Sequence, residues 1–164
     1  MALTKIISGG QTGVDRGALD AALEKGFPCG GWCPPGRLAE DGPIDRAYPM
    51  SEMDHGSYGE RTRRNVIDSD GTLIIHFGPL EGGTKTTLQY CIQLKKPHAL
   101  IDALEASETH AAGLASRFVE SNAVETLNVA GPRQSKITDA YVYAYKVIRL
   151  VLDTAGITKE NAKR

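Results

Sequence analysis

One stretch near the start of the chain limits its fold most: an apolar strand pattern that breaks into glycines and resumes as a helix pattern. The apolar run at residues 5–7 is followed by Gly9, Gly10 and Gly13, and an alanine and leucine pattern with helical spacing covers residues 18–23. A strand, a tight turn and a helix in this order leave backbone N–H groups and the positive end of a helix dipole facing one small space. The pattern fits an anion site, and it also fits a plain turn without a ligand.

The length and charge of the chain exclude several classes of protein. With 164 residues, we expect a single domain over residues 1–157 and a polar C-terminal tail over residues 158–164. A formal net charge of −1 argues against binding to nucleic acid or to a membrane surface, because such proteins usually carry a basic face. The sequence shows neither a signal peptide nor the roughly 20 apolar residues of a spanning helix, so we expect a cytoplasmic protein.

The cysteines and histidines do not predict a metal site. Cys29, Cys33 and Cys91 form no CxxC pair, and the four histidines are scattered singly. Zinc sites need closely spaced ligands, so buried or half-buried free thiols are the favoured interpretation. His76 ends an apolar strand pattern, where a histidine usually has a structural hydrogen-bond partner.

Two further glycine-containing loops repeat the arrangement of the first. The apolar run at 73–77 predicts a central strand, and the loop after it at 78–87 leads into a helix pattern at 88–95. A strand pattern at 123–129 is followed by a loop at 131–136 and a long helix pattern at 137–152. The loop at 78–87 is not a Walker A motif, since the Gly-Lys-Ser/Thr ending is missing.

The alternation of strands and helices predicts an α/β fold: a Rossmann-like, doubly wound, mainly parallel sheet with helices on both faces. The remaining elements are expected as helices at 15–25, 58–69 and 108–120, with Asp15 as the N-cap of the first, as strands at 27–32 and 97–102, and as a long loop at 33–44. Because the carboxyl ends of parallel strands share one edge, all three glycine-containing loops are expected there. We therefore predict a crevice that binds a phosphate-bearing small molecule.

The candidate ligand-binding residues lie in the three loops or are arginines within reach of them. They are Gly9, Gly10, Gln11, Thr12, Gly13, Arg16, Arg37, Arg61, Gly82, Gly83, Thr84, Thr86, Thr87, Gly131, Arg133 and Ser135. The loops supply backbone N–H and hydroxyl donors, and the arginines neutralise charge. Arg37, in the 33–44 loop, and Arg61 are the favoured arginines. Trp32 is either a stacking surface for a ring or a core indole.

Five ordered motifs spread over nearly the whole chain resemble the molybdenum carrier-like family. They lie at residues 9–16, 30–42, 65–72, 82–87 and 128–132. That family is similar to a larger Rossmann-like group, which includes the Lonely Guy phosphoribohydrolases, often mislabelled lysine decarboxylases, and the DNA-processing protein A. The resemblance implies a nucleotide or a pterin phosphate such as molybdenum cofactor as the ligand, and a homodimer or homotetramer. The sequence itself requires no cofactor.

Two functions remain open. In the phosphoribohydrolases an arginine lies nine residues before the aspartate of the central strand, and Arg61 stands in that relation to Asp70. Their loop glutamate, however, is replaced here by Gln89, which cannot act as a general base. The leading hypothesis is a carrier or sensor. The alternative is N-glycosidic cleavage of a nucleoside 5′-monophosphate, with Arg61 and with Asp15, Glu40 or Asp41 as the carboxylate. A protein-binding module would leave the three loops without a role.

Overall fold

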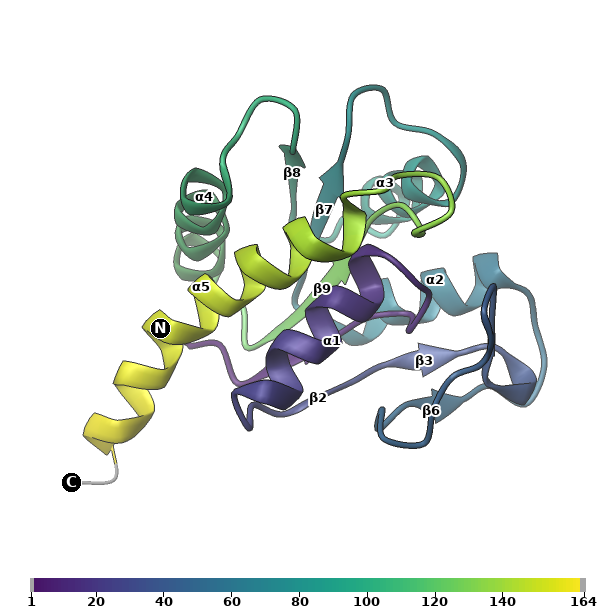
Figure 1. Ribbon diagram of the computed structural model, residues 1–164, viewed down its shortest axis with the longest axis horizontal. Helices are drawn as coiled ribbons and strands as arrows, with labels where there is room; N and C mark the ends of the chain where they lie inside the picture. Colours follow the sequence, from purple (N-terminus) through teal and green to yellow (C-terminus); the bar gives the residue numbers. More distant parts are fainter. Residues whose placement is uncertain (1, 163–164) are drawn as a thin grey trace.

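The five strands of the central sheet are all parallel and lie in the order β2-β1-β9-β7-β8 (Figure 1). The computed structural model describes residues 2–162. The strands are β1 (Lys5–Ile7), β2 (Cys29–Gly30), β7 (Gly71–His76), β8 (His98–Asp102) and β9 (Thr126–Ala130). In one half of the sheet the chain runs outward from β1 to β2, and in the other half it runs outward from β7 to β8. The strands that precede the three glycine-containing loops, β1, β9 and β7, are therefore neighbours.

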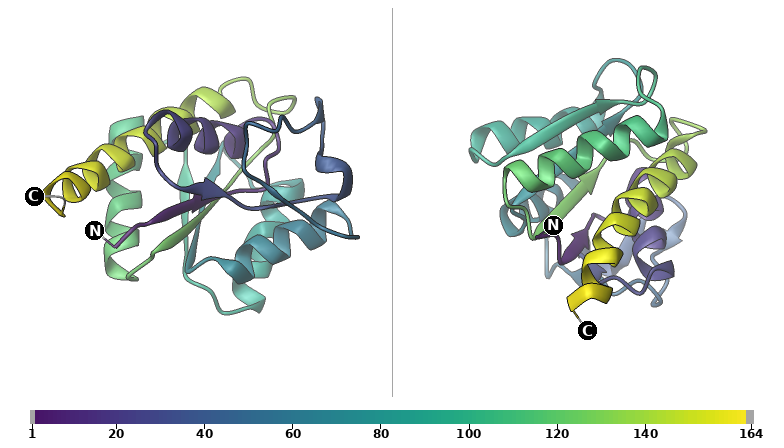
Figure 2. Two further views of the ribbon diagram at one scale, coloured as in Figure 1. Left: turned by 90° about the horizontal axis from the view of Figure 1, so that it is seen from below. Right: turned by 90° about the vertical axis from the view of Figure 1, so that its left-hand side faces the viewer.

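Helices cover both faces of the sheet, as predicted (Figures 1 and 2). On one face α5 (Ala140–Ala162) packs against α1 (Val14–Glu24) and α4 (Glu108–Ser121). On the other face α2 (Tyr58–Asp68) packs against α3 (Gly82–Gln93). This arrangement confirms the doubly wound α/β fold.

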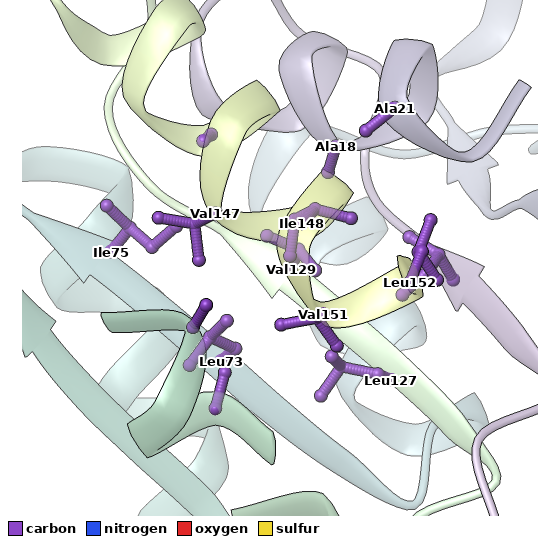
Figure 3. Close-up of a cluster of buried hydrophobic side chains, with 14 of the residues drawn as sticks. Ala18, Ala21, Leu73, Ile75, Leu127, Val129, Val147, Ile148, Val151 and Leu152 are labelled. Carbon is purple, nitrogen blue, oxygen red and sulfur yellow. The ribbon is translucent and has the colours of Figure 1, made fainter. Parts of the chain in front are cut away.

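The larger core lies between the sheet and the α1, α4 and α5 layer. Figure 3 shows Leu73 and Ile75 of β7 and Leu127 and Val129 of β9 facing the buried side chains of α5, such as Ile148. Successive residues of a strand point to opposite faces. Ile74 consequently packs on the α2 and α3 side, and its burial explains why the run at 73–75 is apolar throughout.

The sequence and the structure differ most between the second strand and α2. The predicted strand at 27–32 is interrupted at Gly31, whose φ is 126° and whose added Cβ would lie 2.9 Å from the backbone nitrogen of Ser8. The chain then forms β3 (Trp32–Cys33), which pairs with β6 (Ser51–Glu52) outside the main sheet. The predicted loop at 33–44 contains the 3-10 turn η1 (Pro35–Arg37) and a hairpin of β4 (Leu38–Ala39) and β5 (Gly42–Pro43).

Helix boundaries also differ from the prediction. Asp15 is not the N-cap of α1: Gly13 holds that position, and Asp15 lies in the first turn. Helix α3 begins at Gly82, inside the segment predicted as a loop. Helix α5 begins at Ala140 and continues to Ala162, through most of the predicted polar tail, whose last two residues lie outside the described part of the chain.

The three cysteines are free thiols, with Cys33 and Cys91 buried and Cys29 partly buried. Within residues 2–162, every helix is too short or too polar to cross a membrane.

Candidate functional site

A cavity of about 650 Å³ lies at the carboxyl ends of β1, β9 and β7. All three glycine-containing loops contribute to its wall, and helix α2 closes it from the other side through Arg61 and Asn65. The cavity therefore lies where the loops of a doubly wound sheet separate, which is the usual ligand position in this fold.

The structure brings together about half of the residues predicted to bind a ligand. Those lining the cavity are Gly9, Gln11, Arg61, Gly83, Thr84, Thr87, Gly131 and Arg133, together with the candidate carboxylate Asp15. The predicted residues that do not line it are Gly10, Thr12, Gly13, Arg16, Arg37, Gly82, Thr86 and Ser135, and the candidate carboxylates Glu40 and Asp41.

Arg61 is a buried cation whose hydrogen-bond partners are neutral. Its Nη1 donates to the carbonyl of Gly9 at 2.6 Å, and its Nε donates to the carbonyl of Tyr58 at 3.4 Å. The residue is 7% exposed, and none of the ion pairs found among residues 2–162 includes it. A buried charge is costly unless it is compensated, so this guanidinium favours an anionic group nearby.

Asp15 places a second charged group in the same wall. One carboxylate oxygen accepts a hydrogen bond from the backbone N–H of Gln11 at 3.3 Å. Burial raises the pKa of Asp15 to about 6, and the Arg61 guanidinium is the largest of the influences that lower it. A carboxyl group with this pKa can exchange a proton near neutral pH, and it can also accept hydrogen bonds from ligand hydroxyl or N–H groups.

At another wall of the cavity, a lysine lies beside the start of α3. A Cβ added to Gly82 would lie 2.9 Å from the Nζ of Lys136. The described residues contain no ion pair with Lys136, and the N-cap residue Glu81 makes no capping hydrogen bond through its side chain. The first N–H groups of α3 and the positive end of its dipole therefore meet an uncompensated ammonium group, a combination that favours an anion.

The threonine hydroxyls of α3 are used differently from the prediction. Thr86 and Thr87 donate hydrogen bonds to the carbonyls of Gly82 and Gly83, at 3.2 and 2.9 Å, within the helix. Because α3 begins at Gly82, these residues lie in the second turn and not before the helix. Gly83 is open to the cavity, since an added Cβ there would meet no atom within 4 Å.

The two predicted arginines that do not line the cavity, Arg16 and Arg37, hold loops in place. Arg37 donates to the carbonyls of Ile44, Asp45, Tyr48 and Met50, at 2.8 to 3.4 Å, so its side chain lies in its own loop and not over the cavity. Arg16 pairs with Asp41 at 3.0 Å and also donates to the carbonyl of Gly10. Both guanidinium groups stabilise the segment between β3 and β6.

Trp32 lies outside the cavity wall. Its indole N–H donates to Asp68 at 2.6 Å, and the guanidinium carbon of Arg64 lies 4.7 Å from its ring centroid. The Asn65 side chain donates to the carbonyl of Trp32 at 3.0 Å and accepts from its N–H at 2.8 Å. Asn65 thus attaches α2 to β3 while it also lines the cavity.

The candidate residues predicted from the sequence omit seven polar or charged residues of the wall, which are Tyr58, Thr62, Asn65, His76, Glu81, Asn128 and Lys136. The Nδ1 of His76 lies 2.7 Å from the carbonyl of Gly78. A carbonyl only accepts hydrogen bonds, so Nδ1 carries a proton; in the neutral ring Nε2 is then the acceptor. Asn128 donates to the hydroxyl of Thr72 at 3.3 Å. The sequence feature that could have identified His76 as a cavity residue is its position at the end of a central strand, directly before a loop.

The comparisons with known proteins agree with this fold. The sequence model of cpYpsA, the circularly permutated YpsA SLOG family, matches residues 6–152. The chain belongs to this family. The curated proteins contain no match to it.

A solved structure extends the family assignment. The crystal structure of a protein named putative molybdenum carrier protein, from Syntrophus aciditrophicus SB, matches 92% of this cpYpsA chain and 96% of its own chain. The two share 46% sequence identity, and the TM-score is 0.89. This similarity confirms the molybdenum carrier-like family that the five motifs indicated.

Proposed function

We propose that this cpYpsA-family protein binds a phosphate-bearing small molecule, molybdenum cofactor or a nucleotide, in the cavity and acts as a carrier or sensor. The observation that carries the proposal is the Lys136 ammonium group beside the first turn of α3, without a carboxylate partner among residues 2–162. Arg61, which is in no ion pair among residues 2–162, adds a second cation to the lining of the same cavity. A phosphate would satisfy both the cation and the free N–H groups of the helix.

The rest of the cavity suits the organic part of such a ligand. Phe77, Pro79, Leu80 and Ile137 give it an apolar wall, while Asp15 and Asn128 offer hydrogen-bond partners for ring N–H groups or sugar hydroxyls. Its volume of about 650 Å³ lies within the range of small-molecule sites. The name of the Syntrophus protein supports molybdenum cofactor as one candidate.

Thermal unfolding tests the binding of phosphate. We expect AMP, at a concentration a hundred times its Kd, to stabilise the protein by about 2.7 kcal/mol through mass action. Lys136→Ala is expected to weaken the binding of AMP about tenfold, because one charge-assisted contact to phosphate is lost. Lys146→Ala, which removes an exposed lysine of α5 outside the cavity, is the matched control. Equal affinity in all three proteins would contradict the assignment of phosphate to the start of α3.

A second candidate function, N-glycosidic cleavage of a nucleoside 5′-monophosphate, is favoured by Asp15. This carboxyl group lines the cavity with Arg61, and its pKa is raised to about 6, whereas Gln89 is exposed and outside the cavity wall. Asp15 would then supply the acid or base that Gln89 cannot.

Incubation of the pure protein with AMP separates the two functions. A carrier releases no adenine, so we expect none above the level of a buffer control. Adenine release that disappears in both Asp15→Asn and Arg61→Ala would show that the protein is an enzyme and not a carrier. The homodimer or homotetramer and the cytoplasmic location stay predictions from the sequence.

A further inference from the structure

The hairpin of β4 and β5 places a carboxylate against the loops that precede α1 and α5. The Glu40 carboxylate accepts hydrogen bonds from the backbone N–H and the hydroxyl of Ser135, at 3.1 and 2.6 Å, and from the hydroxyl of Thr12. The Nε of Arg133 lies 3.7 Å from the same carboxylate. We call these groups of Thr12, Arg133 and Ser135 the Glu40 donor set.

The Glu40 donor set has the composition of a phosphate site. A guanidinium, a backbone N–H and two hydroxyls are the usual donors to phosphate oxygens. They come from two of the three loops in which the sequence predicts anion binding. Those loops do hold an anion, and it is a carboxylate of the chain itself.

The Glu40 donor set adjoins the cavity. Arg133 belongs to the donor set and also lines the cavity. Gln11, another residue of the cavity wall, accepts hydrogen bonds from the backbone N–H groups of Glu40 and Thr12, at 2.9 and 3.0 Å. A ligand in the cavity can therefore reach the donor set by displacing the Glu40 side chain.

We propose that the Glu40 donor set is a second oxyanion subsite, which Glu40 blocks in the free protein. Its ligand class is a small molecule with two anionic groups: one binds at Lys136 and the start of α3, and the other replaces the Glu40 carboxylate. The position of the first anionic group, at Lys136, rests on the proposed function. The position of the second anionic group rests on the separate contacts of the Glu40 donor set.

Glu40 is attached in a way that permits exchange. Its side chain is 22% exposed, and the hairpin that carries it has two residue pairs, Leu38 with Pro43 and Ala39 with Gly42. Partial burial raises the pKa of Glu40, but the hydrogen bonds from Ser135 and Thr12 outweigh it and hold the pKa below the ordinary value. The occupant is therefore a charged carboxylate, and its replacement by phosphate leaves each donor with an acceptor.

Calorimetric titration with inorganic phosphate tests the second subsite. The wild-type protein is expected to bind one phosphate per chain, and Glu40→Ala is expected to bind two. The Kd for phosphate at the second subsite should be at least about tenfold lower in Glu40→Ala than in the wild type. In the wild type the tethered Glu40 side chain competes with phosphate at an effective concentration in the millimolar range. Ser135→Ala added to Glu40→Ala should weaken this second phosphate again. Glu105→Ala, which removes an exposed glutamate between β8 and α4, should behave as the wild type.

The outcomes distinguish this proposal from the proposed function. If folded Glu40→Ala binds the same number of phosphates as the wild type with the same Kd values, the second subsite does not exist. If Glu40→Ala does not fold, Glu40→Ser removes the carboxylate but keeps a small polar side chain. A phosphate stoichiometry and Kd values equal to those of the wild type in that variant also contradict the second subsite. If Lys136→Ala leaves the wild-type phosphate unaffected while Glu40→Ala still gains one that requires Ser135, the second subsite stands and the first fails.

Discussion

Asp15→Asn is expected to raise the free energy of unfolding by about 3 kcal/mol at pH 8 and to change it little at pH 4. Burial raises the pKa of Asp15 in the folded protein from 3.8 to about 6. A group with a raised folded pKa contributes stability that is fully present below the unfolded pKa and is lost as the pH rises through the folded pKa. The wild-type protein therefore loses this stability between about pH 4 and pH 7, whereas the neutral asparagine does not titrate.

Thermal or urea unfolding at the two pH values measures the effect. A gain of about 3 kcal/mol corresponds to a Tm increase on the order of 6–12 °C for a chain of this length. Asp54→Asn, at an exposed aspartate, is the matched control and should leave the free energy of unfolding unchanged at both pH values. If Asp15→Asn destabilises the protein equally at pH 4 and pH 8, Asp15 serves as a structural acceptor for the Gln11 N–H and not as a desolvated carboxylate.

A stabilising Asp15→Asn would indicate that the aspartate is kept for a purpose other than folding. A carboxylate that is costly to bury and that lines a cavity beside Arg61 fits a contact with a ligand. Loss of AMP binding together with a higher Tm would connect the two observations.

The sequence predicted the fold because its elements alternate clearly. In a parallel sheet this alternation alone places the loops after β1, β7 and β9 on one edge, and the structure confirms that these strands are neighbours. Gly131 in the cavity wall follows from the same reasoning, whereas Arg61 follows from its match to the arginine of the phosphoribohydrolases. Helix starts were less predictable, because glycines and threonines that are typical of a loop form the first turns of α3.

The remaining parts of the site depend on contacts between distant segments. Nothing local predicts that Glu40 lies against Ser135, because this contact needs the 33–44 segment to fold into a hairpin. Lys136 reaches Gly82 only because β9 lies beside β7 in the sheet. Arg37 carries the same charge as Arg61, yet four backbone carbonyls of its own loop hold it away from the cavity. Residue type predicted an anion site, and only the tertiary contacts determine which cations line the cavity.

Gly9→Ala is expected to weaken the binding of AMP by at least about tenfold, although it removes no side chain that contacts a ligand. An added Cβ at Gly9 would lie 2.6 Å from the guanidinium carbon of Arg61. Gly9 is not among the glycines with positive φ, so its backbone accepts alanine and the guanidinium has to move. Arg61 then loses its hydrogen bond to the Gly9 carbonyl. The displaced guanidinium also loses its charge-assisted contact with AMP, worth about 1.5–3 kcal/mol.

The same substitution should be visible without any ligand. Arg61 is the largest influence that lowers the pKa of Asp15, so moving the guanidinium should raise that pKa above about 6. The pH range over which the stabilisation by Asp15→Asn grows should then end at a higher pH in the Gly9→Ala background than in the wild type, and its value at pH 8 should be larger. Gly113→Ala in α4, where an added Cβ meets no atom within 4 Å, controls for the loss of a glycine and should stabilise the helix by roughly 0.5–1 kcal/mol. If Gly9→Ala leaves both AMP affinity and this pH range unchanged, the position of the Arg61 guanidinium does not determine binding in the cavity.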